Sequence, residues 1–173
     1  MDADWLEVTI DSVRVSLVSP HRIVVLKDKL ERFLPIWIGP FESDAITIAL
    51  QGNQVARPLT HDLLKSVITE TGAVPAYVVV RELRDETFFA SIFMRVDGKT
   101  VEIDARPSDA IALAVRVKVP VYVKEMVMER AAIRPSQSAD GVSREEAEKL
   151  EPFRDLLEDL DLDDLGKGEE KTN

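Results

Sequence analysis

Alternating and β-branched hydrophobic residues dominate the first third of the chain and then give way to helical spacing. Segments 6–18, 22–26 and 33–38 show the alternation that is typical of strands. Apolar residues then recur at helical spacing between Pro40, which suits the first turn of a helix, and Gly52, which suits its end. This part of the chain predicts three strands followed by one helix.

A second helix is expected soon after the first. Thr60 can cap its beginning and Gly72 can end it. The apolar residues expected to face inward are Leu63, Leu64, Val67 and Ile68. The two helices would therefore follow each other with only a short loop between them.

The strand pattern returns after this helix. Strands are expected at 76–83, 88–95 and 100–103, with Asp97 and Gly98 forming a hairpin turn. A third helix begins at Pro107, a short strand covers 121–123, and a helical turn or two covers 125–132. The pattern predicts the α+β class, with a mixed, largely antiparallel sheet and helices packed on it.

One short sequence occurs twice in matching surroundings. Ser-Asp-Ala-Ile stands at 43–46 and again at 108–111, each time after a hairpin and at the start of an alanine-rich helix. The agreement of the flanking pattern favours an internal β-β-α duplication.

The sequence changes character after Ile133. A polar stretch with Pro, Ser and Gly reads as a linker, so we expect a domain over 1–134 and a separate tail over 135–173. The tail is acidic, and its apolar residues recur at helical spacing: Leu150, Phe153, Leu156, Leu157 and Leu160. We expect an acidic amphipathic helix that packs on its own domain, frays in solvent, or docks a protein partner.

Composition narrows the function classes. The chain has 173 residues, no cysteine and two histidines, which excludes disulfides and thiolate metal sites. The net charge is -10, but residues 136–173 hold 13 acids and 5 bases, so the preceding residues carry a net charge of only -2. A nearly neutral body permits a local basic patch for nucleic acid without predicting one. The sequence lacks a transmembrane run and a signal peptide pattern, so we expect a cytoplasmic protein without a membrane partner.

Polar residues gather at strand ends and helix starts. Hard divalent cations prefer carboxylate oxygens, and two-metal phosphodiester hydrolysis needs several acids in one place. The residues considered as ligands of Mg²⁺ or Mn²⁺ are Glu42, Asp62, Asp104 and Asp109. His61 could act as general acid or base beside the catalytic candidates Asp62, Asp104 and Asp109, and Arg57 and Arg106 could hold phosphate.

The same residues have an ordinary structural interpretation. Acids are favoured in the first turns of helices by the free amides and the helix dipole, and four acids fall in such turns: Glu42, Asp44, Asp62 and Asp109. Arg106 could simply pair with Asp104 or Asp109, and His61 could be a surface histidine. A non-catalytic regulatory or protein-interaction domain therefore stays open beside the enzyme hypothesis.

Four segments together resemble the bifunctional nuclease family: LPIWIGPFESDAITIALQG, RPLTHDLL, YVVVRELRDETFFASIFM and VEIDARPSDAIALAVR. The likeness runs from about Val8 to Ile133, and the pairing of RPLTHDL with DARPSDAIALA is its most specific part. The resemblance implies a small mixed α/β protein with nuclease activity on RNA and DNA. The matching positions are Glu42, Arg57, Pro58, Thr60, His61, Asp62, Asp104, Arg106, Pro107, Ser108, Asp109 and Ala110. Apolar surface expected around FLPIWIG also suggests a homo-oligomer.

Overall fold

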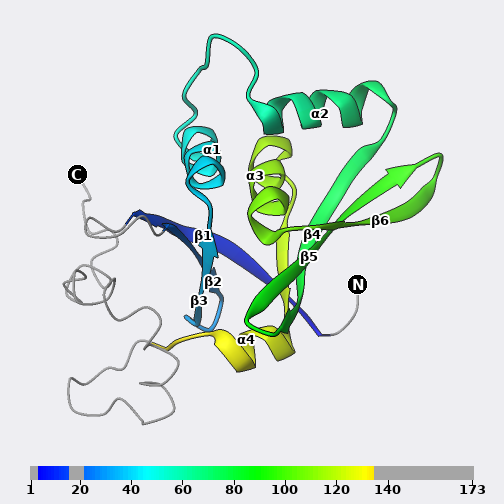
Figure 1. The fold of residues 1–173 in the computed structure, drawn as a ribbon. Coiled ribbons are helices and arrows are strands. Elements are labelled where there is room, and N and C mark those ends of the chain that lie inside the picture. Colours follow the sequence, from blue (N-terminus) through cyan, green and yellow to red (C-terminus); the bar gives the residue numbers. More distant parts are fainter. Residues whose placement is uncertain (1–3, 16–21, 135–173) are drawn as a thin grey trace, which may run out of the picture. The chain divides into compact units, whose positions relative to one another are not determined.

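The structure of the protein is a computed structural model that describes residues 4–15 and 22–134. Runs of strands are followed by helices along these residues (Figure 1). The strands are β1 (Trp5–Val15), β2 (Arg22–Asp28), β3 (Phe33–Ile38), β4 (Val74–Arg84), β5 (Thr87–Val96), β6 (Lys99–Ala105) and β7 (Val121–Lys124). The helices are α1 (Pro40–Leu50), α2 (Thr60–Glu70), α3 (Pro107–Val117) and α4 (Glu125–Ala131).

The strands form one mixed sheet in the order β3-β2-β1-β7-β4-β5-β6. Neighbouring strands are antiparallel except for the parallel pair of β4 and β7. The largely antiparallel α+β fold expected from the sequence is therefore confirmed.

The main core lies between the sheet and the helices. Val78 and Val80 on β4 are buried against α3, whose Ile111 and Leu113 are fully buried. Ile46 of α1 joins the same core, as do the buried residues of α4. Burial of side chains of this size contributes about 1.5–3 kcal/mol each, so this core fixes the positions of α1 and α3.

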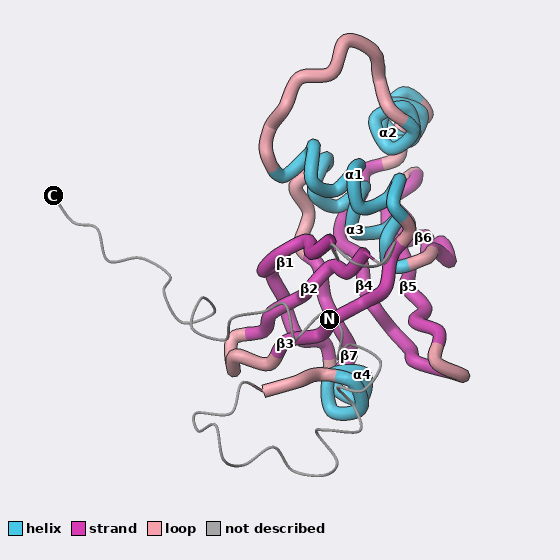
Figure 2. Tube along the Cα trace, turned by 60° about the vertical axis from the view of Figure 1, so that its left-hand side comes forward, coloured by secondary structure: helices cyan, strands magenta, loops and turns pink. Residues whose placement is uncertain are grey.

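The repeated tetrapeptide occupies corresponding places in the two halves of the sheet. The strands β1-β2-β3 lead into α1, and β4-β5-β6 lead into α3, while β7 lies between the two sets. Helices α1 and α3 contact each other and lie side by side above the sheet (Figure 2). The beginnings of both helices therefore come together, although the duplication itself stays a prediction.

The apolar side of α2 differs from its sequence expectation. Ile68 is buried as expected, but Leu63, Leu64 and Val67 are 59%, 37% and 52% exposed. The expected inward orientation of these three residues is therefore wrong. Helical spacing identifies an apolar stripe but does not say whether another element covers it.

The segment FLPIWIG is mostly a core strand rather than an apolar surface. Leu34, Pro35 and Ile36 are buried, and Trp37 is 37% exposed. Trp37 is thus the one exposed large apolar residue in this segment, and the homo-oligomer stays a prediction. The expected tail helix lies outside the described residues, and no helix within the described ranges is long and apolar enough to cross a membrane.

Candidate functional site

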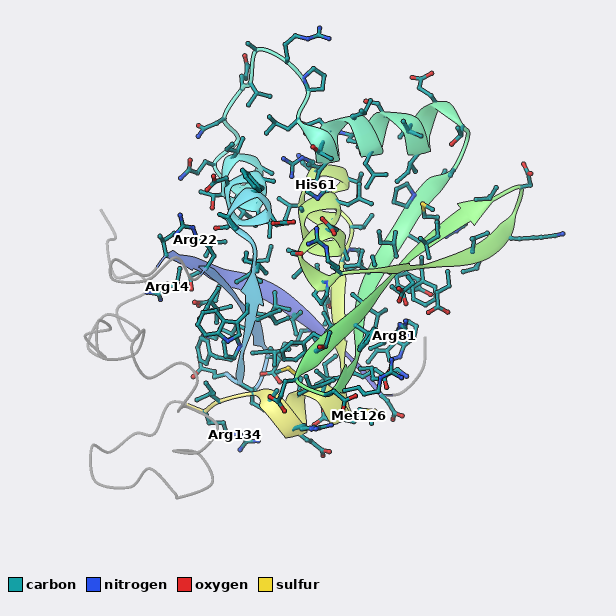
Figure 3. All side chains as sticks on the ribbon, viewed as in Figure 1. Arg14, Arg22, His61, Arg81, Met126 and Arg134 are labelled. Atoms are coloured by element: carbon teal, nitrogen blue, oxygen red, sulfur yellow. The ribbon has the colours of Figure 1, made fainter. Side chains whose placement is uncertain are left out.

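The first turns of three helices meet in one polar cluster. It consists of Glu42 from α1, His61 from α2, and Arg106 and Asp109 at the start of α3, and we call it the three-helix cluster. Arg106 donates from Nη2 to Glu42 Oε1 at 2.6 Å and from Nε to Asp109 Oδ2 at 2.7 Å. His61 Nε2 lies 3.0 Å from Asp109 Oδ1. Figure 3 shows His61 at the beginning of α2, next to α3.

The charges in this cluster stabilise one another. Burial opposes ionisation of Asp109, but hydrogen bonds from Arg106 and His61 outweigh it and lower the pKa of this carboxyl. Hydrogen bonds to Asp109 and Glu42 raise the pKa of Arg106. Asp109 is therefore an anion at neutral pH, and His61 Nε2 must carry the proton that it donates to that carboxylate.

His61 is buried, with 7% of its surface exposed, and is not the surface histidine that was considered from the sequence. Its contact with Asp109 joins the first turn of α2 to the first turn of α3. A buried imidazole held by a carboxylate has a fixed orientation and tautomer, which suits either proton transfer or a purely structural link.

The first-turn acids differ in what they bind. The Asp62 carboxylate accepts the Leu59 backbone N–H at 2.9 Å, as a residue that caps the helix would. No side-chain cap is present at the starts of α1 and α3, where Glu42 and Asp109 bind Arg106 instead. Of these three acids, only Asp62 therefore fits the interpretation as a helix cap.

Asp62 makes a second contact away from the three-helix cluster. Its Oδ1 accepts from Nε of Arg116 at 2.7 Å, and Arg116 is almost completely buried on α3. Burial opposes ionisation of Asp62, but the Leu59 amide and Arg116 outweigh it and lower the pKa of this carboxyl. Polar contacts thus hold α2 on α3, which explains how its apolar stripe can stay exposed.

Asp104 and Arg57 lie outside the cluster. Asp104 is highly exposed on β6 and accepts from Arg81 Nη2 at 2.5 Å, and Figure 3 shows Arg81 well apart from His61. Arg57 lies exposed in the loop between α1 and α2 and has no acidic partner among the described residues. The sequence missed Arg116 and Arg81 as partners, because they stand 54 and 23 positions from the acids that they bind.

The four expected metal ligands do not form a metal site in this arrangement. Each carboxylate already binds an arginine: Glu42 and Asp109 bind Arg106, while Asp62 binds Arg116 and Asp104 binds Arg81. No group of three or more His, Asp or Glu side chains within residues 4–15 and 22–134 is arranged to hold a metal ion. The guanidinium of Arg106 stands where a cation shared by Glu42 and Asp109 would have to lie. We therefore assign no metal-dependent step to these residues.

Gly39 positions Glu42 within the cluster. A Cβ atom at Gly39 would lie 2.2 Å from Glu42 Oε2, so the Gly39→Ala variant must shift this carboxylate and weaken its contact with Arg106. We expect the free energy of unfolding to change little, because weakening a partly exposed ion pair costs about 0.5–1 kcal/mol and replacing glycine by alanine offsets most of that loss. In a Glu42→Ala background the same change should instead stabilise the fold by about 0.4–1 kcal/mol, because the backbone at Gly39 suits alanine. Urea denaturation of the four proteins measures both values, and equal effects in the two backgrounds would contradict this coupling.

Comparison with known proteins shows the family to which the chain belongs. A sequence profile of the bifunctional nuclease domain matches residues 24–136. The relative named "Uncharacterized protein Rv1829" from Mycobacterium tuberculosis is 33% identical over 162 residues, covering 92% of this chain and 97% of its own length. Bifunctional nuclease 1 from Arabidopsis thaliana is 32% identical over 125 residues, covering 69% of this chain but only 38% of the plant protein. Bifunctional nuclease 2 from the same plant is 35% identical over 112 residues, with coverages of 62% and 34%. The match covers all four residues of the three-helix cluster, and the chain belongs to the bifunctional nuclease domain family.

Proposed function

We propose that this protein hydrolyses phosphodiester bonds in RNA and DNA. Membership of the bifunctional nuclease domain family supports the reaction class, and the plant relatives are named as nucleases. The observation that carries the proposal is the pair of buried His61 and half-buried Asp109, which lies beside Arg106 where the starts of α2 and α3 meet. Helix N-termini favour anions, so a phosphate group would be stabilised near this place.

The pair has the arrangement needed for proton transfer. Asp109 holds Nε2 of His61, which leaves the other ring nitrogen, Nδ1, to exchange a proton with the attacking or leaving oxygen. The ionised carboxylate would stabilise the imidazolium that forms during this exchange. Arg106 uses Nε and Nη2 for the two carboxylates, so its Nη1 and the exposed Arg57 are the groups that we assign to phosphate.

One observation favours a second candidate function. The charged groups of the three-helix cluster satisfy one another, and His61 is almost completely buried. A cluster of this kind would also serve a regulatory or protein-interaction domain in which it only holds three helices together. The two candidates differ in whether the protein cleaves nucleic acid.

The direct test is an assay with labelled single-stranded RNA and DNA. The purified protein is incubated with each strand in Mg²⁺, in Mn²⁺ and in excess chelator. We expect cleavage of both strands, since the proposed proton transfer does not depend on which sugar is present. Activity that survives chelation supports chemistry centred on His61, whereas activity lost on chelation would show that the cleavage needs a divalent cation. The absence of cleavage in every condition would overturn the proposal and favour the interaction domain.

A further inference from the structure

The two edges of the sheet are protected to different degrees. The β3 edge contains Pro35, and Phe33 exchanges two backbone hydrogen bonds with Ile133 at 2.8 and 2.7 Å. Proline and a covering segment are two common ways of preventing a sheet edge from pairing with another strand. This edge is therefore partly closed by the chain itself.

The β6 edge has neither kind of protection within the described residues. Strand β6 pairs with β5 from Lys99 to Ala105 without a bulge or a shift in register, and no other described strand lies on its outer side. It contains no proline, and six of its residues are exposed. Figure 1 shows β6 returning from a hairpin tip that points away from α1. No residue in the described ranges pairs with its outward backbone groups, which a further strand could therefore bind.

The side chains of β6 favour such pairing. Val101 and Ile103 are 38% and 42% exposed, and they share the face of Ala105, which packs against the main core. Thr100, Glu102 and Asp104 alternate with them on the opposite face. Exposed β-branched residues on a regular, unpaired edge are what a partner strand would cover.

We propose that β6 pairs with β6 of a second copy of this chain in antiparallel orientation about a two-fold axis. This pairing extends the sheet across both copies and does not depend on the nuclease proposal. If the helices of both copies lie on the same face of the joint sheet, the two-fold axis must pass through a residue of β6 and not between two residues. The reason is that opposite residues of antiparallel strands point to the same face. Centring on Glu102 uses all of β6 and places Val101 of each copy opposite Ile103 of the other.

The strand is self-complementary in this register. Two apolar pairs form on one face, and Thr100 lies opposite Asp104 twice on the other. The second copy's Lys99 lies opposite Ala105, one residue before Arg106 of the three-helix cluster. Glu102 lies opposite its own counterpart, and like charges opposite each other weaken the pairing. A second copy of the chain is therefore the occupant that the strand fits, with an affinity limited by Glu102.

Cysteine crosslinking tests the register directly, because the chain contains no cysteine. Opposite residues of paired strands have Cβ atoms about 4.5–5.5 Å apart, which allows a disulfide after a small adjustment. We expect the Glu102→Cys variant of the full chain to form a disulfide-linked dimer in oxidised glutathione. The matched control Thr100→Cys places the two thiols about 13 Å apart along the strands, beyond disulfide reach. Equal crosslinking of both variants, or none of Glu102→Cys, would overturn the proposed register.

Sedimentation measurements test the dimer without a crosslink. Ile103→Lys should raise the dissociation constant at least about tenfold, because each dimer would cover two unpaired ammonium groups. Glu102→Gln should lower the dissociation constant, because it removes the opposed charges. The surface control Phe41→Lys changes an 83% exposed residue on α1 and should leave the dissociation constant unchanged. A wild-type chain that stays monomeric at all concentrations, or a dimer insensitive to Ile103→Lys, would overturn the proposal. In the case of such a dimer, the variant Leu63→Lys tests whether the exposed apolar surface of α2 forms the interface instead.

Discussion

Asp109→Asn should reduce the cleavage of RNA and DNA by about 10²- to 10⁴-fold, the usual contribution of a positioned general acid or base. The substitution keeps the size of the side chain but removes the anion that holds His61 Nε2 and Arg106 Nε. The imidazole then loses its fixed orientation and the stabilisation of its charged form. Initial rates on labelled single-stranded RNA and DNA, with circular dichroism to confirm folding, measure the effect.

Two further Asp→Asn variants show whether the loss is specific. Asp44 is exposed on α1, outside the cluster, so Asp44→Asn should retain wild-type rates. Asp104 binds Arg81 away from the cluster, and Asp104→Asn distinguishes proton transfer from catalysis by a shared set of carboxylates. Retained activity in Asp104→Asn supports the His61–Asp109 pair, and equal losses at Asp104 and Asp109 would favour the carboxylate set. Wild-type rates in Asp109→Asn would contradict the proposed role of the pair.

Chemical rescue separates catalysis by His61 from its structural role. His61→Ala removes a buried link between α2 and α3 and would lower activity through misfolding as well as through lost chemistry. Added imidazole can replace the lost proton-transfer group. It is not attached to α2, so it cannot restore the link that His61 makes between α2 and α3. A rate that rises with imidazole concentration supports proton transfer by His61, whereas restored folding without restored cleavage supports the structural role.

Local sequence pattern predicted the elements and much of the fold. Strand alternation, Pro40 and Pro107 at helix starts, and the hairpin turn at Asp97-Gly98 each act over a few residues, so their effects can be read directly. The repeated Ser-Asp-Ala-Ile also indicated that two helix starts have similar surroundings. These signals were sufficient to expect polar groups at the starts of the helices.

The pairing of those groups could not be predicted in the same way. Whether Asp109 binds a metal, a helix amide or Arg106 depends on how α1, α2 and α3 meet, and that is set by packing between distant segments. The same holds for α2, where the spacing of Leu63 and Val67 indicated an apolar stripe but not its exposure. Sequence pattern therefore located the candidate chemistry, and tertiary packing determined which charges neutralise each other.

The largest expected loss of stability comes from a different arginine. Arg32 is buried between Asp28, which accepts from its Nε at 2.6 Å, and Glu125 at the start of α4, which accepts from Nη1 and Nη2 at 2.7 and 3.0 Å. Asp28 Oδ1 also accepts the backbone N–H groups of Leu30 and Arg32 at 2.9 Å each. One guanidinium thus ties the turn between β2 and β3 to α4, across 93 positions of sequence.

Arg32→Met should lower the free energy of unfolding at pH 7 by about 3–5 kcal/mol, the usual cost of leaving one partner of a buried ion pair uncompensated. Methionine fills a similar volume, so the loss reports the missing charge rather than a cavity. Most of it should come from Asp28, whose side chain is 3% exposed, because Glu125 is 37% exposed and can turn toward water. Urea denaturation at pH 7 measures the difference, and Lys29→Met is the matched control, since Lys29 is 84% exposed and should change stability by less than about 0.5 kcal/mol.

The pH dependence identifies the carboxylates as the source of this loss. Burial opposes ionisation of Asp28, but hydrogen bonds from the Arg32 amide, the Arg32 side chain and the Leu30 amide outweigh it and lower the pKa of Asp28. The hydrogen bonds from the Arg32 side chain also lower the pKa of Glu125. A carboxyl with a lowered pKa in the folded state stabilises the fold above its unfolded pKa of about 4, and this contribution disappears as the pH falls through the folded value. The difference between wild type and Arg32→Met should therefore be largest near pH 7 and shrink below about pH 4. A difference that stays constant from pH 7 to pH 3 would mean that Arg32 stabilises the fold by packing rather than through its two ion pairs.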